Sequence, residues 1–312
     1  MLTGLSGLLR SPGCAVKRDI MLSRLPVSSL SALLMTAGMF GYVFNDAMIK
    51  IVLEDLPVFQ AIFLRGGLAL PLLVLLALRL GHLRQRMSRS DWLVTLGRAG
   101  LEALCTVWFM EAIRVLSLSN VTAILQAIPI TVTMGAALFM GERVGWRRWL
   151  AIAVGLGGVL IILRPDSSGI SLHAFYALLV VLAATARDLI TRKLSSKAPS
   201  LQVAAITALV IFLLGASQYD SAVWVPVSGY NLLILSLAAL AISATYLLMV
   251  LVMRIGAVSL AAPWRYTAIV WAVLLGFVLL GEWPDLATLC GAVIVVGAGL
   301  FTLWRERQSR LS

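Results

Sequence analysis

Hydrophobic stretches long enough to cross a bilayer recur about ten times along this chain, and the segments between them alternate between basic and base-poor. A hydrocarbon core of roughly 30 Å requires about 20 apolar residues per helix. The sequence therefore predicts an all-α membrane protein. We expect its spans near 29–50, 57–78, 93–115, 119–140, 146–163, 171–191, 200–216, 230–253, 258–280 and 286–303.

The composition agrees with a protein dissolved in lipid. Residues of the hydrophobic set make up 61% of the 312 residues and charged residues only 12%, with a mean hydropathy of +0.98, far above an ordinary soluble domain. The net charge of +11 could suggest a nucleic-acid partner. Such a partner requires basic residues gathered on one face with base-stacking aromatic residues, whereas here they are dispersed over loops, so we expect no nucleic-acid partner.

The basic residues instead predict the orientation of the chain in the membrane. They lie before the first span and after every even-numbered one, while the other connections are acidic, mixed or free of basic residues. By the positive-inside rule, both termini and the even-numbered connections lie in the cytoplasm of a multi-pass inner-membrane protein. The residues that carry this pattern include Arg10, Lys17, Arg18, Arg24, Arg79, Arg84, Arg86, Arg89, Arg143, Arg147, Arg148, Arg192, Lys193, Lys197, Arg254, Arg305, Arg307 and Arg310.

The ends of the chain are predicted to be short cytoplasmic tails over residues 1–28 and 306–312. A short apolar run near Cys14 could pass for a signal peptide, but no convincing small-residue cleavage site precedes a soluble domain. Met21 is an alternative start of translation, and the sequence leaves the choice between Met1 and Met21 open.

The two halves of the chain match each other. An offset of 142 places Asp46 and Lys50 on Asp188 and Arg192, so the same acid-x-x-x-base pattern closes the first span of each half. Five crossings per half is an odd number, so the second half must run inverted, an architecture that recurs in secondary transporters. An offset of 140 places Arg114 on Arg254, Ser119 on Ser259, Gly141-Glu142 on Gly281-Glu282, Gly157 on Gly297 and Leu160 on Leu300.

Two Gly-Glu signatures carry a family resemblance. Met140-Gly141-Glu142-Arg143, and Leu280-Gly281-Glu282-Trp283-Pro284-Asp285, resemble the ends of the two repeats in EamA-type members of the drug/metabolite transporter superfamily, and the pattern Ala262-Pro263-Trp264-Arg265-Tyr266 is similar to one EamA subgroup. The resemblance implies ten helices in two inverted five-helix repeats, here 29–165 and 171–305. It implies transport of amino acids, nucleosides, vitamins, drugs or other small metabolites, and no shared catalytic residue.

Charged residues inside spans indicate where a substrate could bind. A charge at the centre of a spanning helix costs roughly 2.5–3.5 kcal/mol, so it needs a partner or a wet cavity. Arg98 and Glu102 share one face of the third span; they either neutralise each other and fix packing or line a cavity, where Glu102 could bind a cation or carry a proton. Arg65 and Arg265 could each anchor an anionic substrate group or extend to the interface as structural tethers.

Further candidates are Trp264 and Tyr266 beside Arg265, and Gln126 in the fourth span near Pro129, which removes a helix hydrogen bond. Trp264 could stack on an aromatic substrate, although tryptophan more often anchors at the interface or fills the bundle. A packing kink is the preferred interpretation of Pro129.

Two groups of acidic and basic residues are interpreted as structural. The Asp46/Lys50 and Asp188/Arg192 pairs have the spacing of ion pairs within a helix, and we interpret them as tethers or gate elements. Glu142 and Glu282 lie at loop edges, where a capping or interfacial role is expected.

The sequence carries no G-x-x-x-x-G-K-[ST] phosphate loop. Its two histidines lie near loop edges and its three cysteines are spaced too widely for a zinc set, so no metal or cofactor is predicted. We expect a secondary transporter that moves a small organic metabolite, such as an amino acid or vitamin, by alternating access. A drug or toxic-metabolite exporter of the same fold is the alternative, and an intramembrane enzyme or a channel is less favoured. Proton coupling and a homodimer are compatible with the sequence, which leaves substrate, direction, coupling ion and oligomeric state open.

Overall fold

The computed structural model describes residues 27–79, 81–142, 144–164, 170–195, 198–254 and 261–311. The alternative start at Met21, Cys14 and nearly all of the predicted tail over 1–28 lie outside the described residues, as does the Ser259 half of the 140-residue match.

Ten helices of the described residues are long and apolar enough to cross a membrane, and no β strand occurs among these residues. The predicted all-α membrane fold is therefore confirmed. The elements are α2 (Val27–Val52), α3 (Val58–Arg79), η2 (His82–Arg84), α4 (Arg89–Val115), α5 (Leu118–Leu125), α6 (Ile128–Met140), α7 (Trp146–Leu163), α8 (Leu172–Thr191), α9 (Ser200–Ser217), α10 (Gly229–Arg254), η3 (Ala262–Tyr266), α12 (Thr267–Leu280) and α13 (Leu286–Leu311).

The fourth span of each half is not one continuous α-helix. The fourth span of the chain consists of α5 and α6, which are separated at Gln126 and Ala127, and the ninth consists of η3 followed by α12. A proline follows the first interruption at Pro129 and opens the second at Pro263, and proline lacks the N–H that a continuous helix requires. The 140-residue match places the two interruptions at equivalent positions.

The same match holds at the ends of these spans. Gly141 and Gly281 both adopt left-handed backbone, with φ of 70° and 66°, which a side chain would disfavour. The backbone N–H of Glu142 donates to the carbonyl of Ala136 over 3.2 Å, and that of Glu282 donates to the carbonyl of Gly276 over 2.9 Å. The Gly-Glu signatures are therefore two copies of one helix ending.

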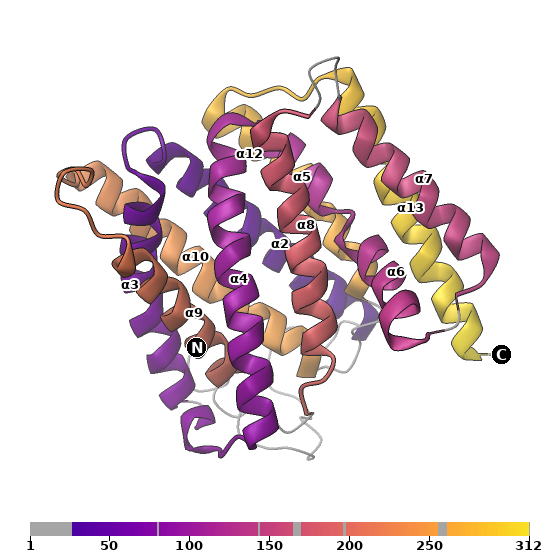
Figure 1. Ribbon diagram of the computed structural model, residues 1–312, viewed down its shortest axis with the longest axis horizontal. Helices are drawn as coiled ribbons and strands as arrows, with labels where there is room; N and C mark the ends of the chain where they lie inside the picture. The colour runs from indigo at the N-terminus through magenta and orange to yellow at the C-terminus, as the bar shows by residue number, and fades with distance from the viewer. Residues whose placement is uncertain are drawn as a thin grey trace.

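Helix packing follows a two-fold pattern between the halves. The first span of each half packs on the third span of the other, α2 on α10 and α8 on α4, while the second spans pack together as α3 and α9 and the fifth as α7 and α13. In Figure 1, α7 and α13 lie side by side at one end of the bundle. Exchanging the halves leaves this pattern unchanged, as two inverted five-helix repeats require.

Glycine permits the close approach of α7 and α13. A Cβ atom on Gly158 would lie 3.0 Å from the carbonyl oxygen of Gly291, and a Cβ atom on Gly291 would lie 2.7 Å from the carbonyl oxygen of Gly158. Neither position has room for a side chain without a backbone shift. These glycines serve helix packing, as in other membrane bundles.

Candidate substrate site

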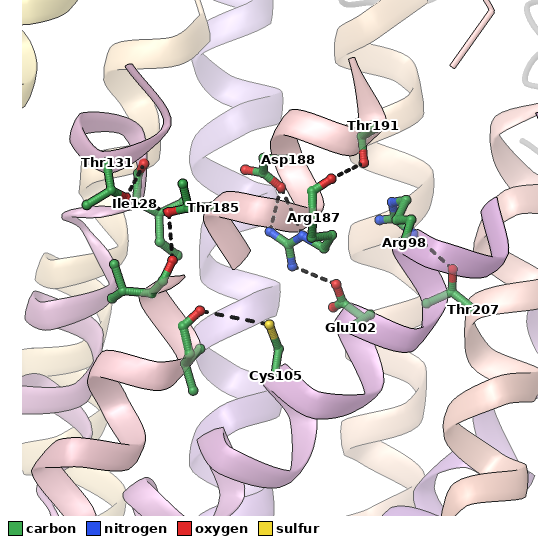
Figure 2. A network of polar contacts seen from close by, with 12 residues as sticks. Arg98, Glu102, Cys105, Ile128, Thr131, Thr185, Arg187, Asp188, Thr191 and Thr207 are labelled. Carbon is green, nitrogen blue, oxygen red and sulfur yellow. Dashed lines mark hydrogen bonds and ion pairs between the residues drawn. The ribbon is translucent and has the colours of Figure 1, made fainter. Parts of the chain in front are cut away.

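An ion pair joins the two repeats inside the bundle. The Nη1 atom of Arg187, on α8, lies 2.6 Å from Oε2 of Glu102, on α4, and its Nη2 atom lies 2.8 Å from Oδ1 of Asp188. Figure 2 shows the guanidinium between the two carboxylates. The side chains of Arg187 and Glu102 are each 19% exposed. Buried charges need such partners because an isolated charge in a low-dielectric interior is costly.

The sequence did not predict a role for Arg187. The available signal was its position: a basic residue within a span, directly before Asp188, at the position that Asn45 occupies in the first repeat. Its partner Glu102 lies on a helix of the other repeat, where local spacing gives no indication of it.

Of the two alternatives for Arg98 and Glu102, direct neutralisation along one helix face is wrong as a contact. The Nη1 atom of Arg98 donates instead to the hydroxyl of Thr207, on α9, over 2.9 Å, as Figure 2 shows. The charge of Arg98 still acts on Glu102, together with those of Arg187 and Arg65. Arg98 thus ties α4 to α9 while contributing to the field around the carboxylate.

A second part of this cluster gathers on α2, α3 and α10. The charge of Arg65, on α3, interacts with those of Asp46 and Glu102 and with the phenol of Tyr246. Tyr42, one helical turn before Asp46, interacts with Tyr246, Glu102, Arg187 and Arg265. We call these seven residues the interior cluster: Tyr42, Asp46, Arg65, Arg98, Glu102, Arg187 and Tyr246.

Two charged groups of the interior cluster have free hydrogen-bonding capacity. Arg65 makes no hydrogen bond and no ion pair to any described residue, and Asp46 bonds only to its neighbour Asn45. Some polar side-chain atoms of the described residues are fully buried without a hydrogen-bond partner, and no atom of Arg65 or Asp46 is among them. The guanidinium of Arg65 and the second carboxylate oxygen of Asp46 therefore border accessible space.

The interrupted spans of the two repeats meet at Gln126. Its side-chain amide donates to the backbone carbonyl of Arg265 over 3.2 Å, so each interruption exposes polar groups to the other. The Arg265 side chain is exposed, and its charge acts on Tyr42. Trp264 is 46% exposed. Tyr266 is buried and fills the space beside Gly299 of α13, with its hydroxyl unpartnered among the described residues.

The predicted ion pair between Asp46 and Lys50 is wrong. The ammonium of Lys50, at the end of α2, pairs with Glu282, at the end of α12, and donates to the carbonyl of Leu116 over 2.6 Å. Glu282 also accepts from the backbone N–H of Leu118 over 2.8 Å. Lys50 bonds across helices because α2 packs against α12, which brings an acceptor from another span within reach.

The predicted pair between Asp188 and Arg192 is wrong for the same reason. Arg192 pairs with Glu142, with Nη1 and Oε1 2.7 Å apart, while Asp188 pairs with Arg187. By the repeat offsets, Arg192–Glu142 is the mate of Lys50–Glu282, each joining the first span of one repeat to the Gly-Glu ending of the other.

The two mates differ in burial. The Lys50 and Glu282 side chains are 11% and 23% exposed, whereas those of Arg192 and Glu142 are 41% and 48% exposed. Leu56, Ile113 and Leu118, which belong to the same hydrophobic cluster as Ile49, are almost fully buried. The ion pair at the Lys50 end is therefore more deeply buried than the equivalent pair at the Arg192 end.

Ten spans in two inverted repeats around a charged interior define a multi-pass membrane transporter. The chain belongs to the EamA-like transporter family, which matches residues 29–164 and again residues 171–304. The protein is thus an EamA-type member of the drug/metabolite transporter superfamily, a transporter of small metabolites in the bacterial inner membrane, and the resemblance found in the sequence is confirmed.

Three curated relatives illustrate the range of the family. The chain is 27% identical over 270 residues to an S-adenosylmethionine uptake transporter of Rickettsia felis, covering 85% of this chain and 89% of that one. It is 28% identical to a riboflavin transporter of Rhizobium johnstonii, covering 68% and 70%. It is 26% identical to the pseudopaline exporter CntI of Pseudomonas aeruginosa strain UCBPP-PA14, covering 85% and 93%.

A solved crystal structure shows the same fold. It superposes with a TM-score of 0.58 at 20% identity, covering 91% of this chain and 99% of that one.

Proposed function

We propose that this transporter carries a small zwitterionic or anionic metabolite by alternating access around the interior cluster. The observation that carries the proposal is Arg65, a cation within a spanning helix that has no hydrogen bond or ion pair to any described residue. An unpaired guanidinium in such a place is costly, and a substrate anion would supply the partner that the protein lacks.

The predicted site residues divide into three groups on this proposal. Arg65, Arg98 and Glu102 belong to the interior cluster, and Arg265 acts on it through Tyr42. Gln126 links the two interrupted spans, and Trp264 offers an exposed ring beside Arg265. Tyr266 is turned toward Gly299 and is the weakest candidate.

The curated relatives support a nitrogen-containing metabolite and leave the direction open, because they include both uptake transporters and an exporter. S-Adenosylmethionine, the substrate in the name of one relative, has an α-amino-acid end that is a zwitterion. We therefore favour a zwitterion over a simple anion. Export of a toxic or surplus metabolite is the alternative, and it uses the same site.

The test is uptake by the purified protein in reconstituted vesicles. S-Adenosylmethionine and the protein amino acids are supplied outside, with riboflavin as an uncharged comparison, and the protein is predicted to give saturable flux of at least one of the compounds that carry an α-amino-acid head group. Replacing Arg65 with Met should abolish that flux, while the matched change Arg79→Met, at the exposed end of the same helix, should preserve it. Flux that rises linearly with concentration indicates a channel, and absence of flux for every compound contradicts the proposal.

We also propose that both termini lie in the cytoplasm, with repeats over 29–165 and 171–305, because the basic connections follow the positive-inside rule. Tyr219 and Gln85 are exposed residues of opposite connections. In a cysteine-free background, Tyr219→Cys should react with an impermeant maleimide in intact cells, and Gln85→Cys only after lysis. The reverse pattern contradicts this orientation.

Proton coupling and a homodimer stay predictions. If protons drive transport, a pH gradient across the vesicle should accumulate substrate above its outside concentration. In the structure Glu102 is engaged by Arg187, so the geometry does not favour Glu102 as a proton carrier.

A further inference from the structure

The first span of each repeat carries the same small side-chain motif. On α2, Nδ2 of Asn45 donates to Oδ1 of Asp46 over 2.9 Å, and on α8, Nε of Arg187 donates to Oδ1 of Asp188 over 2.9 Å. The repeat offset of 142 superposes these two pairs residue by residue. The local geometry is thus preserved between the repeats, and the donor changes from a neutral amide to a cation.

This single difference leaves the two repeats with opposite electrostatic states. In the second repeat, Arg187 neutralises Asp188 and also reaches Glu102. In the first repeat, Asn45 brings no charge, so Asp46 forms no ion pair with any described residue. The side-chain oxygen of Asn45, Oδ1, is fully buried and has no hydrogen-bond partner among the described residues. Asn45 as a whole is only 2% exposed. The α2 side of the cluster is therefore the side that still lacks partners.

Arg65 provides the complementary charge at a distance. Asp46 and Arg65 interact through their charges, yet no ion pair joins them, so their N and O atoms lie more than the 4.0 Å of a salt bridge apart. A carboxylate and a guanidinium thus border accessible space without contacting each other. The phenols of Tyr42 and Tyr246 lie near the charges of this cluster, and neither hydroxyl is hydrogen-bonded to a described residue.

We propose that Asp46 and Arg65 bind the two ends of an α-amino-acid head group, Asp46 accepting hydrogen bonds from the ammonium and Arg65 donating a pair to the carboxylate. This proposal deepens the proposed function and depends on it. A guanidinium fork matches a carboxylate in two parallel bonds, and an ionised carboxylate accepts from an ammonium. A simple cation would leave Arg65 unpaired and a simple anion would leave Asp46 unpaired, whereas a zwitterion satisfies both.

The other charged pairs are poorer candidates for this role. Glu102–Arg187 and Lys50–Glu282 are already joined by direct contacts, so a ligand would have to break an existing ion pair before binding. Asp46 and Arg65 need no such rearrangement, and preorganised partners bind without that loss.

The experiment measures binding by thermal shift and transport in vesicles for the protein amino acids and S-adenosylmethionine. Each compound that binds is compared with its N-acetyl and carboxamide forms, which remove the ammonium and the carboxylate respectively. The wild type should prefer the complete head group by about 10- to 100-fold, because hydrogen bonds between charged groups are worth that much.

Substitutions at Asp46 and Arg65 test which end of the head group each residue binds. Asp46→Asn should weaken binding of the complete compound about as much as N-acetylation does, and should lose discrimination against the N-acetyl form only. Arg65→Met should lose discrimination against the carboxamide only, and Arg65→Lys should recover part of it. Asp220→Asn and Arg79→Met, at exposed positions, are the matched controls and should bind as the wild type does.

A third variant tests the asymmetry itself. Asn45→Arg places at the equivalent position the cation that neutralises Asp188 in the second repeat, so head-group binding should fall although Asp46 and Arg65 are both retained. If Asn45→Arg does not fold, the Asp46 and Arg65 series decides. Saturable transport of the anionic N-acetyl compounds alone, with no complete amino acid bound, overturns the head-group assignment and leaves the proposed function intact. Equal affinity for complete and blocked compounds overturns it as well.

Discussion

Lys50, at the end of α2, pairs with Glu282, at the end of α12, so an ion pair closes the bundle between the first repeat and the second. Its repeat mate, Arg192 with Glu142, joins the repeats in the same way but is much more exposed. The two pairs are therefore equivalent in the repeat architecture and unequal in burial.

Replacing Lys50 with Met should destabilise the protein strongly. It leaves the Glu282 carboxylate, largely buried, without its cation, and breaking one partner of a buried pair costs about 3–5 kcal/mol. The melting temperature in detergent measures the effect. The double variant Lys50→Met with Glu282→Gln should recover part of the loss, because no charge then remains unpaired. A double variant less stable than Lys50→Met would contradict this interpretation.

Replacing Glu142 with Gln should cost little. Its pair with Arg192 is exposed, and exposed pairs contribute about 0–1 kcal/mol. We expect a melting temperature close to that of the wild type, well above that of Glu282→Gln measured in parallel. Similar decreases in melting temperature for the two Gln variants would show that the difference in burial between the two ion pairs does not affect stability.

Arg187 should be the most sensitive residue of the interior cluster. Replacing it with Met leaves Glu102 and Asp188 as two carboxylates without their shared cation, so the inserted protein should unfold at a lower temperature than the wild type. Adding Glu102→Gln should partly restore stability, since one unpaired charge is removed. Strictly additive losses would mean that Glu102 and Arg187 are energetically independent.

Asp285 should give the folded protein a pH-dependent contribution. Its carboxylate accepts from the backbone N–H of Thr288 over 2.8 Å at the start of α13 and pairs with Arg164 over 2.5 Å. The backbone N–H of Thr288, then the Thr288 side chain and after it the Arg164 charge hold the pKa of Asp285 below its usual range, against a smaller opposing effect of burial. Because the pKa of Asp285 is lower in the folded than in the unfolded state, the group stabilises the folded protein at pH values above the unfolded-state pKa of roughly 4. This stabilisation is lost as the pH falls through the folded-state pKa.

Asp285→Ala should accordingly lower stability at pH 7 by about 1 kcal/mol, the usual effect of removing a helix cap. The difference in melting temperature from the wild type should narrow as the pH is lowered below about 4. Thermal unfolding over a pH series measures this, with Asp220→Asn as an exposed control. A difference that widens in acid would contradict the assigned role.

The spans and the repeat were predictable because both are encoded locally. Apolar length determines what crosses lipid, and the Gly141-Glu142 and Gly281-Glu282 signatures mark two identical helix endings whose left-handed glycines are a local backbone requirement. The interruption of the fourth span was indicated by Pro129.

The charged partners were not predictable in the same way. The i,i+4 spacing suggested Asp46 with Lys50 and Arg98 with Glu102, but helix packing places Glu282 beside Lys50 and Arg187 beside Glu102. Which acceptor a long side chain reaches depends on which helices pack together. That packing is determined by residues spread over both repeats. The offset of 142 superposes Asn45 on Arg187 in the sequence. Only the structure shows the consequence, because there Arg187 pairs with Glu102 and Asp188.

The most direct test of the account is saturable uptake of the amino-acid panel by reconstituted vesicles carrying the wild type, Arg65→Met or Arg79→Met. We predict saturable flux of at least one compound with an α-amino-acid head group for the wild type and Arg79→Met, and its loss for Arg65→Met. Equal flux through Arg65→Met and the wild type would contradict the account.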